Sequence, residues 1–90
     1  MQLLQKPSFQ RAYKKLKPNQ KKDADAAIDE IIRCPTIGVQ KKADLSNILV
    51  YKFRMVNQLT LLAYTFEDDK LILTFIAIGA HENFYRDLKK

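Results

Sequence analysis

The spacing of apolar residues changes once along this chain, and that change limits the folds open to it. Before residue 35, apolar side chains recur every three or four residues, as on one face of a helix. After residue 47 they alternate or form continuous runs, as strands do. Helices therefore precede most of the strands, which predicts an α+β domain with the helices on one face of an antiparallel sheet.

The N-terminal part of the chain predicts a short strand and a helix. Residues 2–6 are expected to be a strand, and Pro7 ends it because proline cannot donate a ladder hydrogen bond. Ser8 offers a hydroxyl that can cap the helix. The apolar face of this helix follows the i, i+3, i+4, i+7 spacing and consists of Phe9, Ala12, Tyr13 and Leu16.

A second helix is expected after Pro18, which interrupts the first pattern. Asn19 can accept hydrogen bonds from the free N–H groups at its start, and the helix should run from Gln20 to about Cys34. Pro35 stops it. The apolar stripe of this helix consists of Ala24, Ala27, Ile28, Ile31 and Ile32. We expect the two helices to pack as a hairpin on the sheet.

The second half of the chain predicts a loop, a three-stranded antiparallel meander and a tail. Residues 35–47 hold few apolar side chains, which favours a loop. The strands are expected at Leu49–Val56, Leu59–Phe66 and Lys70–Ile78. Asn57 and Gln58 form the first turn, Gly79 ends the last strand, and His81–Lys90 forms a short helix or tail. The order is thus β-α-α-β-β-β in one domain, residues 1–90, whose second sheet face is partly open.

The charge balance favours an anionic partner. Lysine and arginine number 16 against 10 acidic residues, a formal charge of +6. Four of those acids lie close together, so the remaining surface is more basic than the total suggests. These acids are Asp23, Asp25, Asp29 and Glu30. Each phosphate neutralised by lysine or arginine releases counterions, which favours nucleic acid. Excess lysine could also serve only to keep a small protein soluble.

The remaining composition argues against several other classes. No apolar run approaches the ~20 residues that span a bilayer, and the residues before Pro7 are too few for a signal peptide. We therefore expect a cytoplasmic protein with no membrane partner. Cys34 is the only cysteine, so no internal disulfide can form, and no Cys/His cluster has metal-ligand spacing. We expect neither a metal nor a cofactor.

Several segments are informative because of their combination and order. Phe9–Leu16 ends in Lys-Lys-Leu, and Pro35 with Gly38 marks the break after the second helix. Tyr51–Arg54 is a basic strand, and Ile78–Tyr85 joins an apolar strand to a glycine, a histidine and an aromatic residue. Together they resemble the RelE/ParE superfamily of toxins from type II toxin–antitoxin systems. The resemblance implies a compact α+β domain of the microbial ribonuclease type, with a concave positive face.

The resemblance also implies a reaction, the cleavage of messenger RNA without a metal. Such cleavage uses the neighbouring 2′-OH as nucleophile and needs a base, an acid and cations near the phosphate. Histidine is the residue type whose side chain titrates nearest neutral pH, which makes His81, the only histidine, the candidate acid or base. Lys52 and Arg54 project from one face of a strand and can grip phosphates. An exposed histidine and a solvated strand face would explain these residues equally well.

Other residues are candidates for contact with RNA. Tyr85 can stack on a base or position the phosphate and so joins the catalytic set, whereas Phe84 beside it is expected in the core. Lys42 and Arg86 are candidate outer phosphate contacts, although ordinary surface charge explains both. Many members of the superfamily carry an arginine on the middle strand of the meander. In that region this chain has Thr60, Leu61 and Leu62.

Three functions are therefore open at this point. The first is an mRNA endoribonuclease that inhibits translation and acts on messages at the ribosome. The second is a ParE-type toxin that inhibits gyrase and has no nuclease chemistry. The third is a non-toxic module that only binds an antitoxin. In each case the expected direct partner is a cognate antitoxin, whose amphipathic segment would wrap the helices or the open sheet face.

Overall fold

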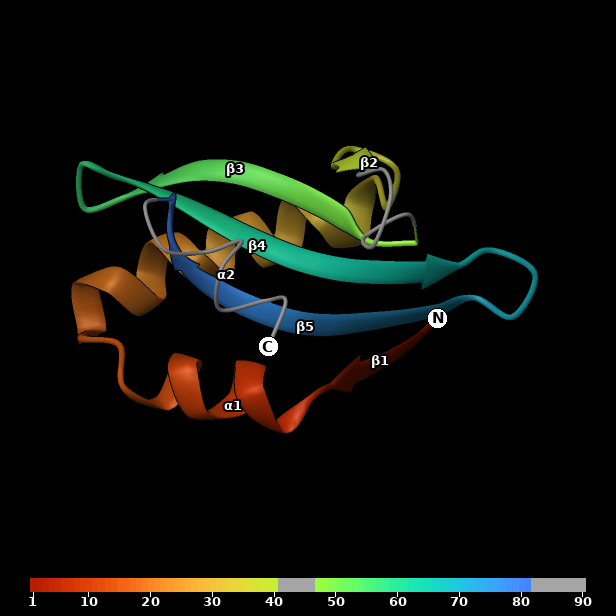
Figure 1. Cartoon of the computed structure of the whole chain (residues 1–90), viewed down its shortest axis with the longest axis horizontal. Coiled ribbons are helices and arrows are strands. Elements are labelled where there is room, and N and C mark those ends of the chain that lie inside the picture. Colours follow the sequence, from red (N-terminus) through yellow and green to blue (C-terminus); the bar gives the residue numbers. More distant parts are fainter. Residues whose placement is uncertain (41–46, 82–90) are drawn as a thin grey trace.

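Five strands of the described chain form one sheet, and two helices lie along one of its faces (Figure 1). The computed structural model describes residues 1–40 and 47–81. Across the sheet the strands lie in the order β1-β5-β4-β3-β2, and all neighbours are antiparallel except β1 and β5. The predicted α+β fold is confirmed. In chain order the elements are β1 (Gln2–Gln5), α1 (Pro7–Lys14), α2 (Pro18–Arg33), β2 (Val39–Gln40), β3 (Leu49–Met55), β4 (Gln58–Glu67) and β5 (Ile72–Ala80).

The first helix begins at Pro7, one residue before the predicted cap Ser8. Proline suits the first helical position because its missing N–H has no partner there and its φ is already helical. Ser8 therefore lies inside α1 and does not cap it, so that prediction is wrong. Its hydroxyl donates to the carbonyl oxygen of Ile76 at 2.7 Å. Ile76 is the residue left without a partner where the register of β5 against β4 shifts, so Ser8 satisfies a carbonyl group at an irregularity of the sheet.

The second helix also begins at a proline, which makes the predicted Asn19 cap wrong. Pro18 occupies the first helical position and Asn19 follows inside the helix. The free N–H of Lys17 is instead satisfied by the side chain of Gln20, whose Oε1 accepts it at 2.8 Å. The helix ends at Arg33, close to the predicted end. Figure 1 shows α1 and α2 running in opposite directions, as a helical hairpin does.

The main core lies between the helices and the sheet. α1 packs on β5 and α2 packs on β3. Phe9 of α1 is 2% exposed and stacks on Phe75 of β5, with 5.4 Å between ring centroids. The buried residues of this core are Phe9, Ala24, Ile31, Met55, Leu62, Tyr64, Leu73, Phe75 and Ile78. They come from both helices and from three neighbouring strands, so the core holds each helix against the sheet.

The sheet face that turns away from the helices carries a second, smaller buried cluster. Val50 of β3 and Leu61 and Ala63 of β4 are its members, and each is at most 1% exposed. The alternation along β3 separates these two cores, because Val50 lies on one face and its neighbour Leu49 packs against the other. Part of this second face is therefore closed, and the exposed part lies farther along β3.

The segment 35–47, predicted to be a loop, contains the two-residue strand β2, which pairs with β3. So short and exposed a strand carries no alternation signal, and tertiary contacts determine where it lies. Tyr64 of β4 supplies two of them. Its hydroxyl donates to the Pro35 carbonyl at 2.6 Å and accepts the Gly38 N–H at 2.9 Å. Burial raises the pKa of the Tyr64 phenol above its ordinary value.

Glycine is required at position 38 because the Tyr64 ring lies against its backbone. A Cβ atom there would stand 2.8 Å from the Tyr64 hydroxyl oxygen and 3.2 Å from the Cβ of Leu49.

At the other end of the sheet, Gly79 does not end the last strand as predicted. It pairs with Leu61, and β5 continues to Ala80. No described helix combines the length and the apolar character needed to cross a membrane.

Replacing Tyr64 with phenylalanine tests the hydroxyl contacts. Tyr64→Phe leaves the Pro35 carbonyl and the Gly38 N–H without this partner, so we expect the free energy of unfolding to fall by about 1–3 kcal/mol. Urea denaturation measures the change. Tyr51→Phe is the matched control, because the Tyr51 hydroxyl makes no hydrogen bond among the described residues, and it should change stability by less than about 0.5 kcal/mol. Equal losses in the two variants would contradict this account of Tyr64.

Candidate functional site

Lys52 and Arg54 lie on the face of β3 that turns away from the helices. Both are exposed. Tyr51, which precedes Lys52, and Phe53, which lies between the two cations in the sequence, pack against the main core. Phe53 and Tyr51 also stack on each other, with ring centroids 6.1 Å apart. Because the aromatic residues are fixed on the inner face, the two cations are fixed on the outer one. The strand thus presents two adjacent positive charges to solvent.

His81 follows directly after β5 and is exposed, at the same end of the sheet as Arg54. The last residue of β5, Ala80, pairs with Thr60 of β4, and Arg54 of β3 pairs with the preceding residue Leu59. Neighbouring strands lie about 4.8 Å apart, so the backbones of β3 and β5 are about 10 Å apart here. An arginine side chain and a bound nucleotide can bridge that distance. The sheet register therefore brings Lys52, Arg54 and His81 to one end of the molecule.

Beside Arg54, the exposed residue of β4 is Leu59. Thr60, Leu61 and Leu62 occupy the region of the middle strand where the resemblance to the superfamily implied an arginine. All three are buried, with exposed fractions of 1, 0 and 0%. Leu59 is 37% exposed and lies opposite Arg54 in the register. Sequence reasoning missed this position because its orientation depends on where the turn before β4 lies.

The turn between β3 and β4 lies one residue before the predicted one and consists of Val56 and Asn57. Their φ angles are +50° and +68°, the signature of a tight two-residue hairpin turn. Asparagine tolerates this left-handed region, but a β-branched residue rarely adopts it. Arg54 Nη1 donates to the Asn57 carbonyl at 3.3 Å, and this hydrogen bond joins the Arg54 side chain to the turn.

The remaining predicted contacts, Lys42, Tyr85 and Arg86, fall in residues 41–46 and 82–90 and so lie outside the described residues, as do Phe84 and most of the predicted C-terminal helix or tail. Within residues 1–40 and 47–81, no three His, Cys, Asp or Glu side chains are grouped as metal ligands would be.

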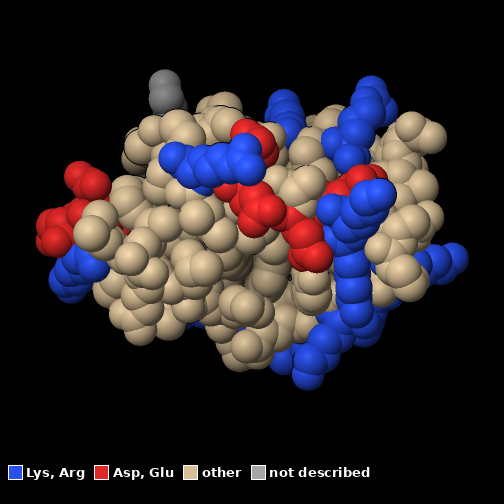
Figure 2. All heavy atoms as spheres, turned by 180° about the vertical axis from the view of Figure 1, so that it is seen from behind, with Lys and Arg blue, Asp and Glu red and all other residues tan. Residues whose placement is uncertain are grey.

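Positive charge also gathers on the helices near this end. Figure 2 shows the molecule from the side of the helices, with lysine and arginine concentrated toward the end where α1 meets α2. Within residues 11–22 the basic side chains are Arg11, Lys14, Lys15, Lys17, Lys21 and Lys22. The one ion pair among the described residues joins Arg33 to Glu30 at 3.5 Å, and both side chains are exposed. The cations of residues 11–22 are thus free of contact ion pairs within the described chain.

Tyr13 links the two helices beneath this basic surface. Its hydroxyl donates to Asp25 Oδ1 at 2.6 Å, and Lys21 Nζ lies 5.5 Å from the centre of its ring. The hydrogen bond to the Asp25 carboxylate raises the pKa of the Tyr13 phenol. These contacts hold α1 beside the first half of α2.

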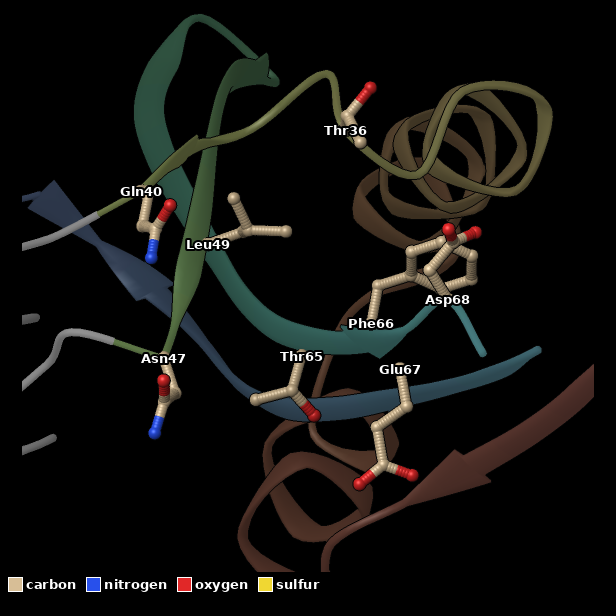
Figure 3. Close-up of a pocket in the computed structure, with 8 residues that line it drawn as sticks. All are labelled: Thr36, Gln40, Asn47, Leu49, Thr65, Phe66, Glu67 and Asp68. Atoms are coloured by element: carbon tan, nitrogen blue, oxygen red, sulfur yellow. The ribbon is translucent and has the colours of Figure 1, made fainter. Parts of the chain in front are cut away.

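A hollow of about 600 Å³ lies at the opposite end of the sheet (Figure 3). Its lining residues are Thr36, Gln40, Asn47, Leu49, Thr65, Phe66, Glu67 and Asp68. The carboxylates of Glu67 and Asp68 give this hollow a negative border, which repels phosphate. The hollow is therefore separate from the site formed by Lys52, Arg54 and His81.

Comparison with models of known protein families gives a match over almost the whole chain, and this match agrees with the fold and with the basic face of β3. Residues 3–89 match the model of a ParE-like toxin of type II bacterial toxin-antitoxin systems. The chain belongs to this family. The resemblance to the RelE/ParE superfamily, which we predicted from several sequence segments and their order along the chain, is confirmed. The protein is a toxin of a type II toxin–antitoxin system.

Solved structures show that the toxin shares its fold with other members of the superfamily. A chain of the intact E. coli RelBE toxin–antitoxin complex is 19% identical with a TM-score of 0.70, over 88% of this chain and 94% of that one. A YoeB/ParE toxin from Agrobacterium tumefaciens is 17% identical with a TM-score of 0.72, over 90% and 99%. A mutant of E. coli RelE in the free state is 17% identical with a TM-score of 0.73, over 98% and 88%. Among curated proteins, no sequence matches the toxin significantly.

The strain at Val56 gives a direct test of the turn beside the site. Val56→Asn places a residue suited to positive φ there, and because Val56 is 45% exposed little burial is lost. We expect the free energy of unfolding to rise by about 1 kcal/mol. Urea denaturation measures it, with Val39→Asn as the control, since Val39 is an exposed valine in an extended strand. A gain at Val39 equal to that at Val56 would contradict the assignment of strain.

Proposed function

We propose that this toxin is a metal-independent mRNA endoribonuclease that inhibits translation in the cytoplasm by cutting messages at the ribosome. The observation that carries the proposal is the grouping of His81 with Lys52 and Arg54 at one end of the sheet. The structural likeness to E. coli RelE and to a YoeB/ParE toxin supports it at the level of the fold. All three side chains are exposed, so an RNA strand can approach them without a change in the fold.

In this proposal the charges on β3 hold the phosphate and His81 moves the proton. A base removes the proton of the 2′-OH, the 2′-oxygen bonds to phosphorus, and the bond to the 5′-oxygen breaks. The 5′-oxygen takes a proton as it leaves, which yields a cyclic phosphate and a 5′-OH. His81 serves as the acid or the base of this sequence. Arg54 can bind two phosphate oxygens through its planar guanidinium, and Lys52 adds a point charge.

The proposed direct partner of the toxin is a cognate antitoxin. Two of the similar structures contain one: the intact E. coli RelBE complex, and E. coli RelE bound to a peptide of the antitoxin RelB. A formal charge of +6 favours a partner segment that carries acidic residues. Such a segment would neutralise the same cations that the RNA contacts, which would couple binding of the antitoxin to loss of activity.

A second candidate function is inhibition of gyrase without nuclease chemistry. The family model that matches the toxin is described as ParE-like, and an apolar residue, Leu59, stands between Arg54 and His81. Assays of gyrase supercoiling and of RNA cleavage with the same purified toxin separate the two functions. Inhibition of gyrase with no cleavage of RNA would replace the nuclease by this alternative.

Removal of the histidine tests the proposed chemistry. His81→Ala should lower the rate of message cleavage about 10²–10⁴-fold, the usual contribution of acid–base catalysis. Because His81 is exposed, we expect the variant to fold normally. The measurement is cell-free translation with mapping of the message ends, together with thermal unfolding. Lys70→Ala is the control, because Lys70 is an exposed cation in the turn at the opposite end of the sheet. A folded His81→Ala toxin that still cuts RNA at the wild-type rate would overturn the proposal.

Adding a cation at Leu59 tests the position of the phosphate. Leu59→Arg places a guanidinium between Arg54 and His81, so we expect tighter binding to a single-stranded RNA. The slope of log affinity against log salt should steepen by about 0.7, the value for one additional phosphate contact on a single strand. Leu71→Arg is the control, since Leu71 is also an exposed leucine, 52% against 37% for Leu59, but lies in the β4–β5 turn. An equal change of slope in both variants would show that RNA does not bind at this end.

A further inference from the structure

Asp23 of α2 reaches the turn between β3 and β4 although it lies far from it in the sequence. Its Oδ2 accepts the N–H of Val56 at 2.8 Å. The pair Met55 and Gln58 closes the hairpin, so the N–H of the first turn residue is not part of the β-ladder. A carboxylate that accepts this N–H makes a charge-assisted hydrogen bond, which is stronger than a neutral one. Asp23 therefore supplies the turn with a partner that the sheet does not provide.

A second backbone group of the turn, the Asn57 carbonyl, is held by the site itself. The Asn57 carbonyl accepts from Arg54 Nη1 at 3.3 Å. The turn thus lies between a carboxylate of α2 on one side and the guanidinium of the site on the other. Arginine loses about 2 kcal/mol of rotamer entropy when it is fixed, so a contact that restricts Arg54 in advance lowers the cost of binding a phosphate.

Two other roles for Asp23 do not fit its position. It is not in the first turn of α2, where an acid would favour the helix dipole, because that turn holds no acidic residue. Among the described residues it forms no ion pair, since the one such pair joins Arg33 to Glu30. The hydrogen bond to the turn is thus the one polar side-chain contact shown for Asp23 in the described chain.

We propose that Asp23 is a positioning residue that fixes the Val56–Asn57 turn and, through the Asn57 carbonyl, holds Arg54 in place for the RNA phosphate. This proposal rests on the proposed nuclease function. It adds a residue of α2 to a site whose phosphate contacts lie on β3. The negative charge of Asp23 is not itself attractive to RNA. Its effect is expected only through the turn and Arg54.

The test compares three variants of the full-length toxin in single-turnover cleavage of a short RNA. Asp23→Ala should lower the cleavage rate about tenfold, whereas Asp23→Asn keeps an oxygen acceptor and should retain most of the rate. Asp29→Ala is the matched control, because Asp29 is an exposed acid of the same helix with no hydrogen bond or ion pair among the described residues. Both alanine variants remove one negative charge, so a general electrostatic effect on RNA would appear in both.

A double-mutant cycle separates positioning from general destabilisation. In an Arg54→Ala background, Asp23→Ala should cause no further loss of cleavage rate, because the residue that it positions is gone. Urea denaturation of the same proteins shows whether each remains folded under the assay conditions. A tenfold loss from Asp23→Ala in both backgrounds would overturn the proposal.

Nuclear magnetic resonance distinguishes failure of this inference from failure of the nuclease function. If the wild-type toxin cuts no RNA, the nuclease proposal fails, but the contacts can still be measured. Asp23→Ala should speed hydrogen exchange of the Val56 amide at least tenfold and lower the order parameter of the Arg54 side-chain N–H. An unchanged Arg54 order parameter would refute the positioning role whatever the toxin acts on.

Discussion

The pairing of β3 with β4 is the constraint on which the rest of the site depends. Seven consecutive residue pairs join the two strands, and a two-residue turn closes them. Because side chains alternate along a strand, a shift of one residue would turn Lys52 and Arg54 toward the helices and their aromatic neighbours toward water. The burial of Met55 and the packing of Tyr51 and Phe53 oppose that shift. The hydrophobic core beneath the helices thus sets the direction of charges on the opposite face.

The helices do more than cover this core, because they satisfy backbone groups where the sheet is irregular. Ser8 of α1 donates to the carbonyl of Ile76, where the register of β5 shifts. Asp23 of α2 accepts the N–H of Val56, where the chain reverses. Backbone groups that lack a ladder partner need one elsewhere, and a side chain of the packed helix provides it at both places. The two helices therefore stabilise the sheet at the turn next to Arg54 and at the irregularity in β5, the strand that leads to His81.

The distribution of charge gives the toxin two different ends. On the helical side, cations gather where α1 meets α2, with the acids of α2 among them. Lys52 and Arg54 add positive charge on the outer face of β3, whereas Glu67, Asp68 and Asp69 lie in the turn between β4 and β5. Charges separated by more than about 8 Å are screened at physiological salt, so the local grouping of cations matters more than the total of +6. The outer face of β3 thus attracts a polyanion, whereas the acidic turn between β4 and β5 repels it.

Local spacing could predict much of this arrangement. The helical face that begins at Phe9 and the alternation along β3 follow from the order of residues alone, as does the common face of Lys52 and Arg54. The caps predicted at Ser8 and Asn19 were wrong, because each helix begins at a proline. Strand β2 was missed, because a pair of exposed residues has no period and Tyr64 determines where it lies.

The sequence by itself determined which residue types are present, the order of the helices and of the strands other than β2, and which face of the helices and of β3 is apolar. Only the tertiary structure decided that His81 lies at the same end of the sheet as Arg54, that Leu59 and not Thr60 faces solvent there, and that Asp23 reaches the turn. The physical reason is that these relations join residues far apart in the chain. They depend on strand register and helix packing, which no local pattern encodes.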